Sequence, residues 1–142
     1  MFISPETKSN IVVDPVKADL TEDQRAVVDV IKRCLMATHV RDTATLRQVF
    51  HPTASHIGWD EGDLRHVTLD RWLAFVDSIP SPESTGQVYD KAIEWLEVCG
   101  TAAIVRVRAA YRPFSYVAYF SLVKTTDGWR IVFECYNQER TR

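Results

Sequence analysis

The chain has 142 residues, of which 46% are hydrophobic and 25% are charged, and its formal net charge at pH 7 is −2. This length and composition are typical of one globular domain with a single hydrophobic core. The weak negative charge gives no reason to expect nucleic acid or an anionic membrane as a partner, and no apolar run approaches the ~20 residues of a membrane-spanning helix.

The N-terminal segment differs from the rest of the chain. Residues 1–20 contain prolines and no helical periodicity, so we expect an extended arm, partly ordered against a partner subunit, before a single domain over 21–142. The arm lacks the basic stretch and apolar core of a secretory signal. Three widely spaced cysteines, Cys34, Cys99 and Cys135, favour reduced thiols packed in the core of a cytoplasmic protein.

Two helices are predicted next. Thr21 and Gln24 have the spacing of a capping box, and apolar residues then recur at helical spacing as far as Thr38. Asp42 is the expected N-cap of a second, short helix that presents Leu46, Val49 and Phe50 on one face. His51-Pro52 ends this helix, because the residue before a proline is disfavoured in helical conformation.

The remaining elements change from helical to strand periodicity. A short strand is predicted over residues 54–59 with a turn at 60–63, and Thr68 begins a third helix. After a loop, alternating patterns predict four long strands, over 88–98, 102–111, 115–124 and 129–137. Helices followed by an antiparallel meander indicate an α+β protein, with the helices on one face of the sheet.

Two stretches carry a resemblance to a known family. "RDTATLRQVFHPTASH" (41–56) and "LVKTTDGWRIV" (122–132), in this order, resemble the NTF2-like superfamily, and are closest to its SnoaL-like and "putative lumazine-binding" groups. The resemblance covers residues 21–137. It implies a cone-shaped fold, in which about three N-terminal helices pack on a curved, mostly antiparallel sheet and leave a cavity at the open end.

Ketosteroid isomerase is one enzyme with this fold, and it uses an Asp base with an oxyanion hole made of a Tyr and a protonated Asp. Alignment on Asp42 and the 50–54 segment puts Gly58 in the place of the Asp base and Cys34 in the place of the helix Tyr. Because both side chains are missing, we do not expect ketosteroid isomerase chemistry by that machinery.

Glu134 stands in an aromatic and β-branched run, and its direction has two interpretations. Strict alternation from Trp129 puts Phe133 on the same face as Trp129 and Glu134 on the opposite one, toward solvent or a partner subunit. A bulge near the strand end would turn Glu134 inward. A buried carboxylate acquires a partner or a raised pKa, and either suits a general base.

Two further residues are candidates for acid–base chemistry. Arg41 shares a helical face with Cys34 and Thr38, and is either a solvated cation at the helix end or a donor to a developing oxyanion. His56 has the inward parity by the family alignment. It is either a hydrogen-bonded core residue or a group that moves a proton near neutral pH.

Aromatic residues are abundant, and most of them are expected to belong to the core. A tyrosine hydroxyl on a cavity wall can donate to a substrate carbonyl. Tyr116 and Tyr119 have opposite parity, so they cannot both point inward without a bulge. The residues we expect to bind substrate are Thr38, Trp59, Trp72, Tyr111, Tyr119 and Phe133.

The set Arg41, Tyr116 and Glu134 also resembles that of fungal NTF2-like isomerases of secondary metabolism, which rearrange intermediates without a cofactor, including rearrangements of the semipinacol type. No phosphate-binding loop, nucleophile elbow or metal motif is present, so we expect no cofactor and no metal.

The first hypothesis is an isomerase or cyclase that transfers protons on an apolar polycyclic small molecule, with Arg41, His56, Tyr116 and Glu134 as catalytic residues. The second is a non-catalytic small-molecule-binding or assembly module. A homodimer is expected in either case.

Overall fold

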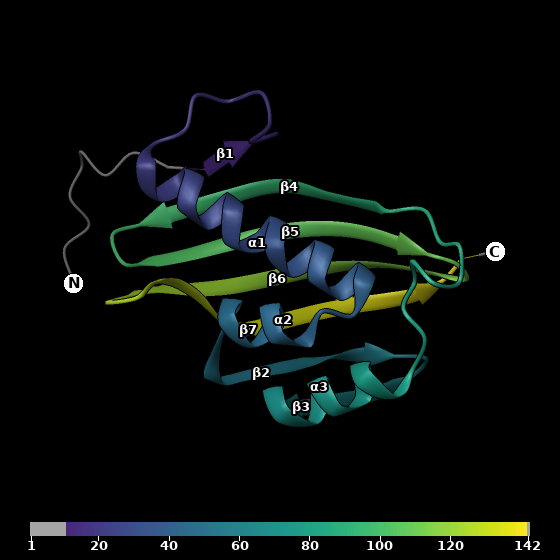
Figure 1. Ribbon diagram of the computed structural model, residues 1–142. Helices are drawn as coiled ribbons and strands as arrows, with labels where there is room; N and C mark the ends of the chain where they lie inside the picture. Colours follow the sequence, from purple (N-terminus) through teal and green to yellow (C-terminus); the bar gives the residue numbers. More distant parts are fainter. Residues whose placement is uncertain (1–10, 142) are drawn as a thin grey trace.

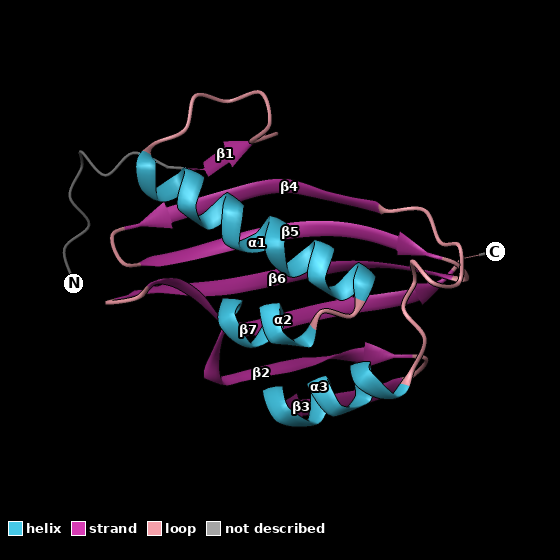
Figure 2. Ribbon diagram, viewed as in Figure 1, coloured by secondary structure: helices cyan, strands magenta, loops and turns pink. Residues whose placement is uncertain are grey.

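A seven-stranded sheet carries three helices on one of its faces (Figures 1 and 2). The computed structural model describes residues 11–141. The strand order is β1-β4-β5-β6-β7-β2-β3, and all neighbours are antiparallel except β2 and β7. The elements are β1 (Ile11–Val13), α1 (Glu22–Val40), α2 (Thr43–Val49), β2 (Phe50–Asp60), β3 (Asp63–Thr68), α3 (Leu69–Ser78), β4 (Asp90–Cys99), β5 (Ala102–Tyr111), β6 (Phe114–Thr125) and β7 (Gly128–Arg140).

All three helices begin at the residues that the sequence predicts. The Thr21 hydroxyl accepts from the Gln24 backbone N–H, and the Gln24 side chain accepts from the Thr21 N–H, which completes a capping box for α1. Asp42 and Thr68 cap α2 and α3 in the same way, each through its side-chain oxygen. α1 ends at Arg41, which adopts a left-handed conformation with φ of 61°.

The core lies between the helices and the inner face of the sheet, which is the face they cover. α1 and α2 contribute residues at helical spacing, and the strands contribute every second residue. The largest side chains that are almost fully buried are Ile31, Leu46, Phe50, Leu73, Leu96, Phe120 and Ile131.

The region after α2 differs from the prediction. β2 begins at Phe50, which we placed on the second helix, and it is longer than the predicted strand at 54–59. β3 was not predicted at all. It is an edge strand with mostly exposed side chains, so its sequence lacks the alternation of apolar and polar residues that marks a half-buried strand.

The arm is partly a strand of the sheet. Ile11–Val13 forms β1, which pairs antiparallel with β4 of the same chain, where we expected order against a partner subunit. Residues 1–10 of the predicted arm lie outside the described residues. The boundary between arm and domain at residue 20 stays a prediction. The four-strand meander β4–β7 agrees with the sequence pattern in order and pairing.

Candidate functional site

A bulge in β7 decides the direction of Glu134. Leu122 of β6 pairs with Ile131, whereas the preceding Ser121 pairs with Phe133, so Val132 is an extra residue without a partner on β6. An extra residue resets the alternation of side chains. Ile131 and Glu134 therefore share the inner face, and Phe133 points to the outer face. The Glu134 side chain therefore points inward, which is the second of the two directions considered from the sequence.

Glu134 lies beside His56. The two residues are partners in the parallel pairing of β7 with β2, and Glu134 Oε1 lies 3.3 Å from His56 Nδ1. The imidazole packs against Phe50 and Trp72, with ring centroids 5.1 Å and 4.3 Å away. The Glu134 side chain is 13% exposed and that of His56 only 3%, so Glu134 is the more exposed member of the pair.

Burial moves the pKa values of the pair in opposite directions, because it disfavours the charged form of each group. It raises the pKa of Glu134 to about 7, although Lys91 acts in the opposite sense. It lowers the pKa of His56 to about 4, and His66 adds to this. Near pH 6 the contact therefore joins a neutral carboxyl to a neutral imidazole and is not an ion pair. Neither ring nitrogen of His56 makes a well-oriented hydrogen bond with residues 11–141.

Arg41, Tyr111 and Tyr116 are close enough to one another to affect each other's charge. Burial lowers the pKa of Arg41, and the two phenols oppose this. The Tyr111 and Tyr116 rings meet edge to face at 5.5 Å. Burial, with Glu134 as a further cause, raises the pKa of Tyr111 to about 12. Burial, with Tyr111 and Glu134 as further causes, raises the pKa of Tyr116 well above its usual value, so both hydroxyls stay protonated and can donate.

Only some of the hydrogen-bond donors of the Arg41 guanidinium have partners among the described residues. One of its NH₂ groups, Nη1, donates to the Thr38 carbonyl at 3.0 Å, while Nε is buried without a hydrogen-bond partner among the described residues. The Thr38 hydroxyl donates to the Cys34 carbonyl at 2.8 Å. This hydroxyl therefore holds the last turn of α1, and the free donor at the helix end is Arg41.

Sequence reasoning missed Tyr136, which fills the space above Gly58. A Cβ atom at position 58 would lie 2.3 Å from the Tyr136 carbonyl oxygen and 2.7 Å from its ring. The position of the ketosteroid isomerase base thus has no room for a side chain, in agreement with the expectation from the alignment. Tyr136 stands two residues after Glu134 and shares its face, a relation that is visible only once the bulge is known.

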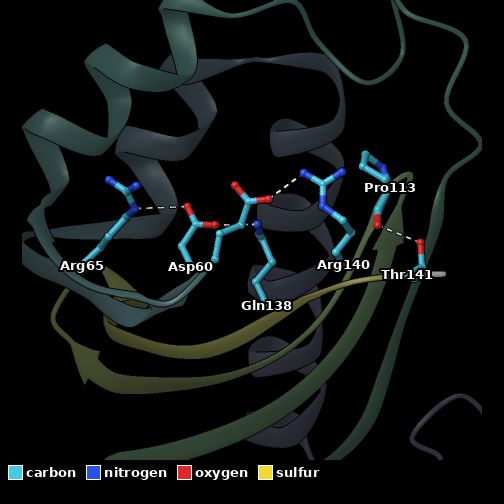
Figure 3. Close-up of polar contacts among 7 residues, drawn as sticks. Asp60, Arg65, Pro113, Gln138, Arg140 and Thr141 are labelled. Carbon is cyan, nitrogen blue, oxygen red and sulfur yellow. Dashed lines mark hydrogen bonds and ion pairs between the residues drawn. The ribbon is translucent and has the colours of Figure 1, made fainter.

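A set of polar contacts joins strand ends at one end of the sheet (Figure 3). Gln138 Nε2 donates to Asp60 Oδ1 at 2.9 Å, and Asp60 also pairs with Arg65 at 3.2 Å. These contacts tie the β2–β3 hairpin to β7, four residues beyond Glu134. The other contacts drawn there join Arg140 to Glu61 at 2.6 Å and Thr141 to the Pro113 carbonyl at 2.7 Å.

Three of the residues predicted to bind substrate do not join this group. Trp59, Tyr119 and Phe133 lie on the outer face of the sheet, and Trp59 is 54% exposed. The Tyr119 hydroxyl accepts from Arg106, which also pairs with Glu94 at 2.9 Å. The bulge at Val132 explains the place of Phe133, and ordinary alternation explains the other two. The residues that the structure does bring together are Thr38, Arg41, His56, Trp72, Tyr111, Tyr116 and Glu134.

Comparisons with known proteins support the fold described above. Residues 22–137 match the family model described as "Putative lumazine-binding". The chain belongs to this family. No curated protein matches it.

Solved structures similar to this family member include two NTF2-like proteins of unknown function. The one from Silicibacter pomeroyi is 22% identical with a TM-score of 0.73, over 81% of this chain and 94% of that one. The one from Shewanella baltica is 24% identical with a TM-score of 0.73, over 87% and 100%. A ketosteroid isomerase-like protein from Erwinia carotovora atroseptica is 16% identical with a TM-score of 0.66, over 84% and 98%. These matches confirm the predicted fold.

In the described part of the chain, no helix is long and apolar enough to cross a membrane. No group of three or more His, Cys, Asp and Glu residues within 11–141 could hold a metal ion.

Proposed function

We propose that this chain is a cofactor-independent isomerase or cyclase that transfers a proton on an apolar polycyclic small molecule. The observation that supports this most is the contact between Glu134 and His56 on the inner face, 3.3 Å apart and nearly buried. A carboxyl with a pKa of about 7 is matched to proton transfer at neutral pH, because both of its forms are populated there.

In this proposal Glu134 is the general base and then the acid. Its carboxylate removes a proton from a carbon next to a substrate carbonyl. The electron pair of the broken C–H bond forms a C=C bond, and the π pair of the carbonyl moves onto its oxygen. The neutral Glu134 carboxyl then returns the proton to another carbon, so no cofactor takes part. His56 contacts Glu134 and is less exposed, so we assign it a positioning role.

The developing oxyanion would be stabilised by Arg41, Tyr111 and Tyr116. Arg41 has an unused Nε–H, and both phenols stay protonated, so all three residues can donate a hydrogen bond. Trp72, which packs against His56, would contribute an apolar wall. Burial strengthens such interactions, because little water competes for the donors.

The experiment is deuterium exchange at the acidic carbon of β-tetralone, a bicyclic ketone, followed by NMR in D₂O. We expect the chain to accelerate exchange and Glu134→Gln to reduce the acceleration by ~10²–10⁴-fold, the usual contribution of a general base. Glu94→Gln is the matched control, because Glu94 pairs with Arg106 on the outer face. Equal exchange by Glu134→Gln and the unaltered chain would contradict the proposed role.

A second candidate function is a non-catalytic binding module, which the family description favours because it names a ligand, lumazine. The aromatic residues around Glu134 would suit a flat heteroaromatic ring. Saturable binding of lumazine, equal in the unaltered chain and Glu134→Gln, without exchange above the buffer rate on β-tetralone, would favour this function over the enzyme.

We also propose a homodimer through the outer face of the sheet. The three helices cover only the inner face (Figure 2). Partly exposed apolar and aromatic side chains remain on the outer face, and a second copy of this face would cover them. They are Ile57, Trp59, Trp95, Ile104, Val117, Tyr119 and Phe133.

A further inference from the structure

We propose that Lys91 is a covalent binding site for small aldehydes or ketones, held as a reversible imine in a cavity. The cavity lies between the segment 14–20, α1 and the beginning of β4. Neither Glu134 nor His56 lines it, and imine formation does not require the proposed isomerase activity.

The cavity has a volume of about 830 Å³, which is in the range of small-molecule sites. Lys91 is part of its wall and is partly buried, so the amine can meet a ligand without unfolding of the chain. Next to Lys91 the wall is apolar, which favours an uncharged carbonyl group there, although charged side chains also line the cavity. The apolar residues nearest to Lys91 in sequence or on the facing helix are Val28, Leu35, Met36, Tyr89 and Ile93.

The Lys91 amine is held without a negative partner. Nζ donates to the Leu35 carbonyl oxygen of α1 at 3.1 Å, and no carboxylate among residues 11–141 lies within ion-pair distance of it. Lys17 and Lys124, in contrast, pair with Asp14 at 3.4 Å and Asp23 at 3.0 Å. A carbonyl acceptor serves a neutral amine as well as an ammonium group, so the contact does not fix the charge.

The groups that face Lys91 come from three elements. Cys34 lies on α1 and Arg41 at its end, Glu134 lies on β7, and the Tyr89 ring is centred 5.8 Å from Nζ on the segment before β4. Burial is the largest influence and lowers the pKa of Lys91 to about 8; Arg41 acts in the same sense, whereas Cys34 and Glu134 oppose it.

The neutral form of the Lys91 amine is a nucleophile, and a pKa of about 8 means that this form is populated near neutral pH. At pH 7 roughly a tenth of Lys91 is unprotonated, compared with roughly 0.03% of a lysine with the ordinary pKa of 10.5. A desolvated lysine of this kind is the usual partner of carbonyl compounds. The Nζ lone pair attacks the carbonyl carbon, and both Nζ hydrogens leave with the carbonyl oxygen as water. The product is a C=N bond, and no oxidant or reductant is needed.

The test uses benzaldehyde as the probe on the folded, full-length chain, with sodium borohydride to reduce the imine to a stable amine and peptide mass spectrometry to locate it. At pH 7 we expect Lys91 to be labelled about 10–100-fold faster than Lys32 and Lys124, because burial favours the neutral form of the Lys91 amine. The labelling of Lys91 should level off above pH 8. Equal labelling rates for Lys91 and Lys32 would overturn the proposal.

Lys32 is a matched control, because it lines the same cavity but is exposed. Lys91→Met should remove the fast label, and Lys32→Met should leave it unchanged. If Lys91→Met does not fold, the ratio of labelling rates in the unaltered chain decides the question alone. Glu134→Gln should keep the fast label, so a failed isomerase proposal and a failed imine proposal can be told apart.

Discussion

Glu134 binds its proton more tightly in the folded chain than in the unfolded one. Burial raises its pKa from 4.5 to about 7, so the folded state takes up the proton first as pH falls. The protonated form thus favours folding. This contribution to the free energy of unfolding is complete below pH 4.5 and is lost as pH rises through 7. His56 acts in the other sense, because its pKa is lowered from 6.5 to about 4 and its contribution is lost as pH falls.

The difference in unfolding free energy between the unaltered chain and Glu134→Gln isolates the contribution of Glu134, since His56 is present in both. Relative to Glu134→Gln, we expect the unaltered chain to lose about 3 kcal/mol of unfolding free energy between pH 4.5 and pH 8. Urea denaturation at several pH values measures this. Glu94→Gln, which changes a carboxyl on the outer face, is the control variant. If the unfolding free energies of the unaltered chain and Glu134→Gln change in parallel with pH, burial does not shift the pKa of the Glu134 carboxyl.

At the scale of elements, sequence and structure agree where a local signal exists. Thr21, Asp42 and Thr68 start helices because each offers a side-chain oxygen to the first free N–H groups of a helix. The meander follows from alternation and turn residues. β3 gave no such signal, because an exposed edge strand can carry polar residues on both faces.

The candidate site was less accessible to sequence reasoning than the fold. The parity of His56 follows from its strand, and the structure places it on the inner face. The bulge at Val132 has no signal of its own, because a valine in a β-branched run looks the same whether or not it has a partner. One extra residue exchanges the faces of Phe133 and Glu134. For this reason the sequence could only leave the direction of Glu134 open.

The contact between Glu134 and His56 also depends on long-range pairing. β2 and β7 run parallel, although the sequence between them folds into β3, α3 and the rest of the meander (Figure 1). This register, including the irregularity between Phe50 and Ser55, sets which residue of β2 lies beside Glu134. Lys91 was missed for the same reason, since the groups that face it come from α1, β7 and the segment before β4.

For the whole molecule, the uncovered outer face leads to a prediction on oligomeric state. Val117 lies on the central strand β6 and faces away from the helices, opposite Arg108 and Asn137 of the neighbouring strands. A charge there would be desolvated in a homodimer formed through this face. We expect Val117→Lys to convert a dimer into a monomer, as measured by light scattering after size-exclusion chromatography.

The matched control for this prediction is Phe75→Lys. Phe75 is also apolar and 59% exposed, but it lies on α3, on the other side of the sheet. This variant should keep the mass of the unaltered chain. A monomeric unaltered chain, or equal masses for the chain and Val117→Lys, would contradict a dimer through the outer face.

The pKa of the Glu134 side chain decides whether this residue can act as the base, and it is measured from the pH dependence of the carboxyl ¹³C NMR signal, assigned with Glu134→Gln. We expect a midpoint of about 7, because the bulge turns the carboxyl inward, where it is buried beside a neutral His56. A midpoint near the ordinary value of 4.5 would show a solvated carboxylate, and the assignment of Glu134 as the base would be wrong.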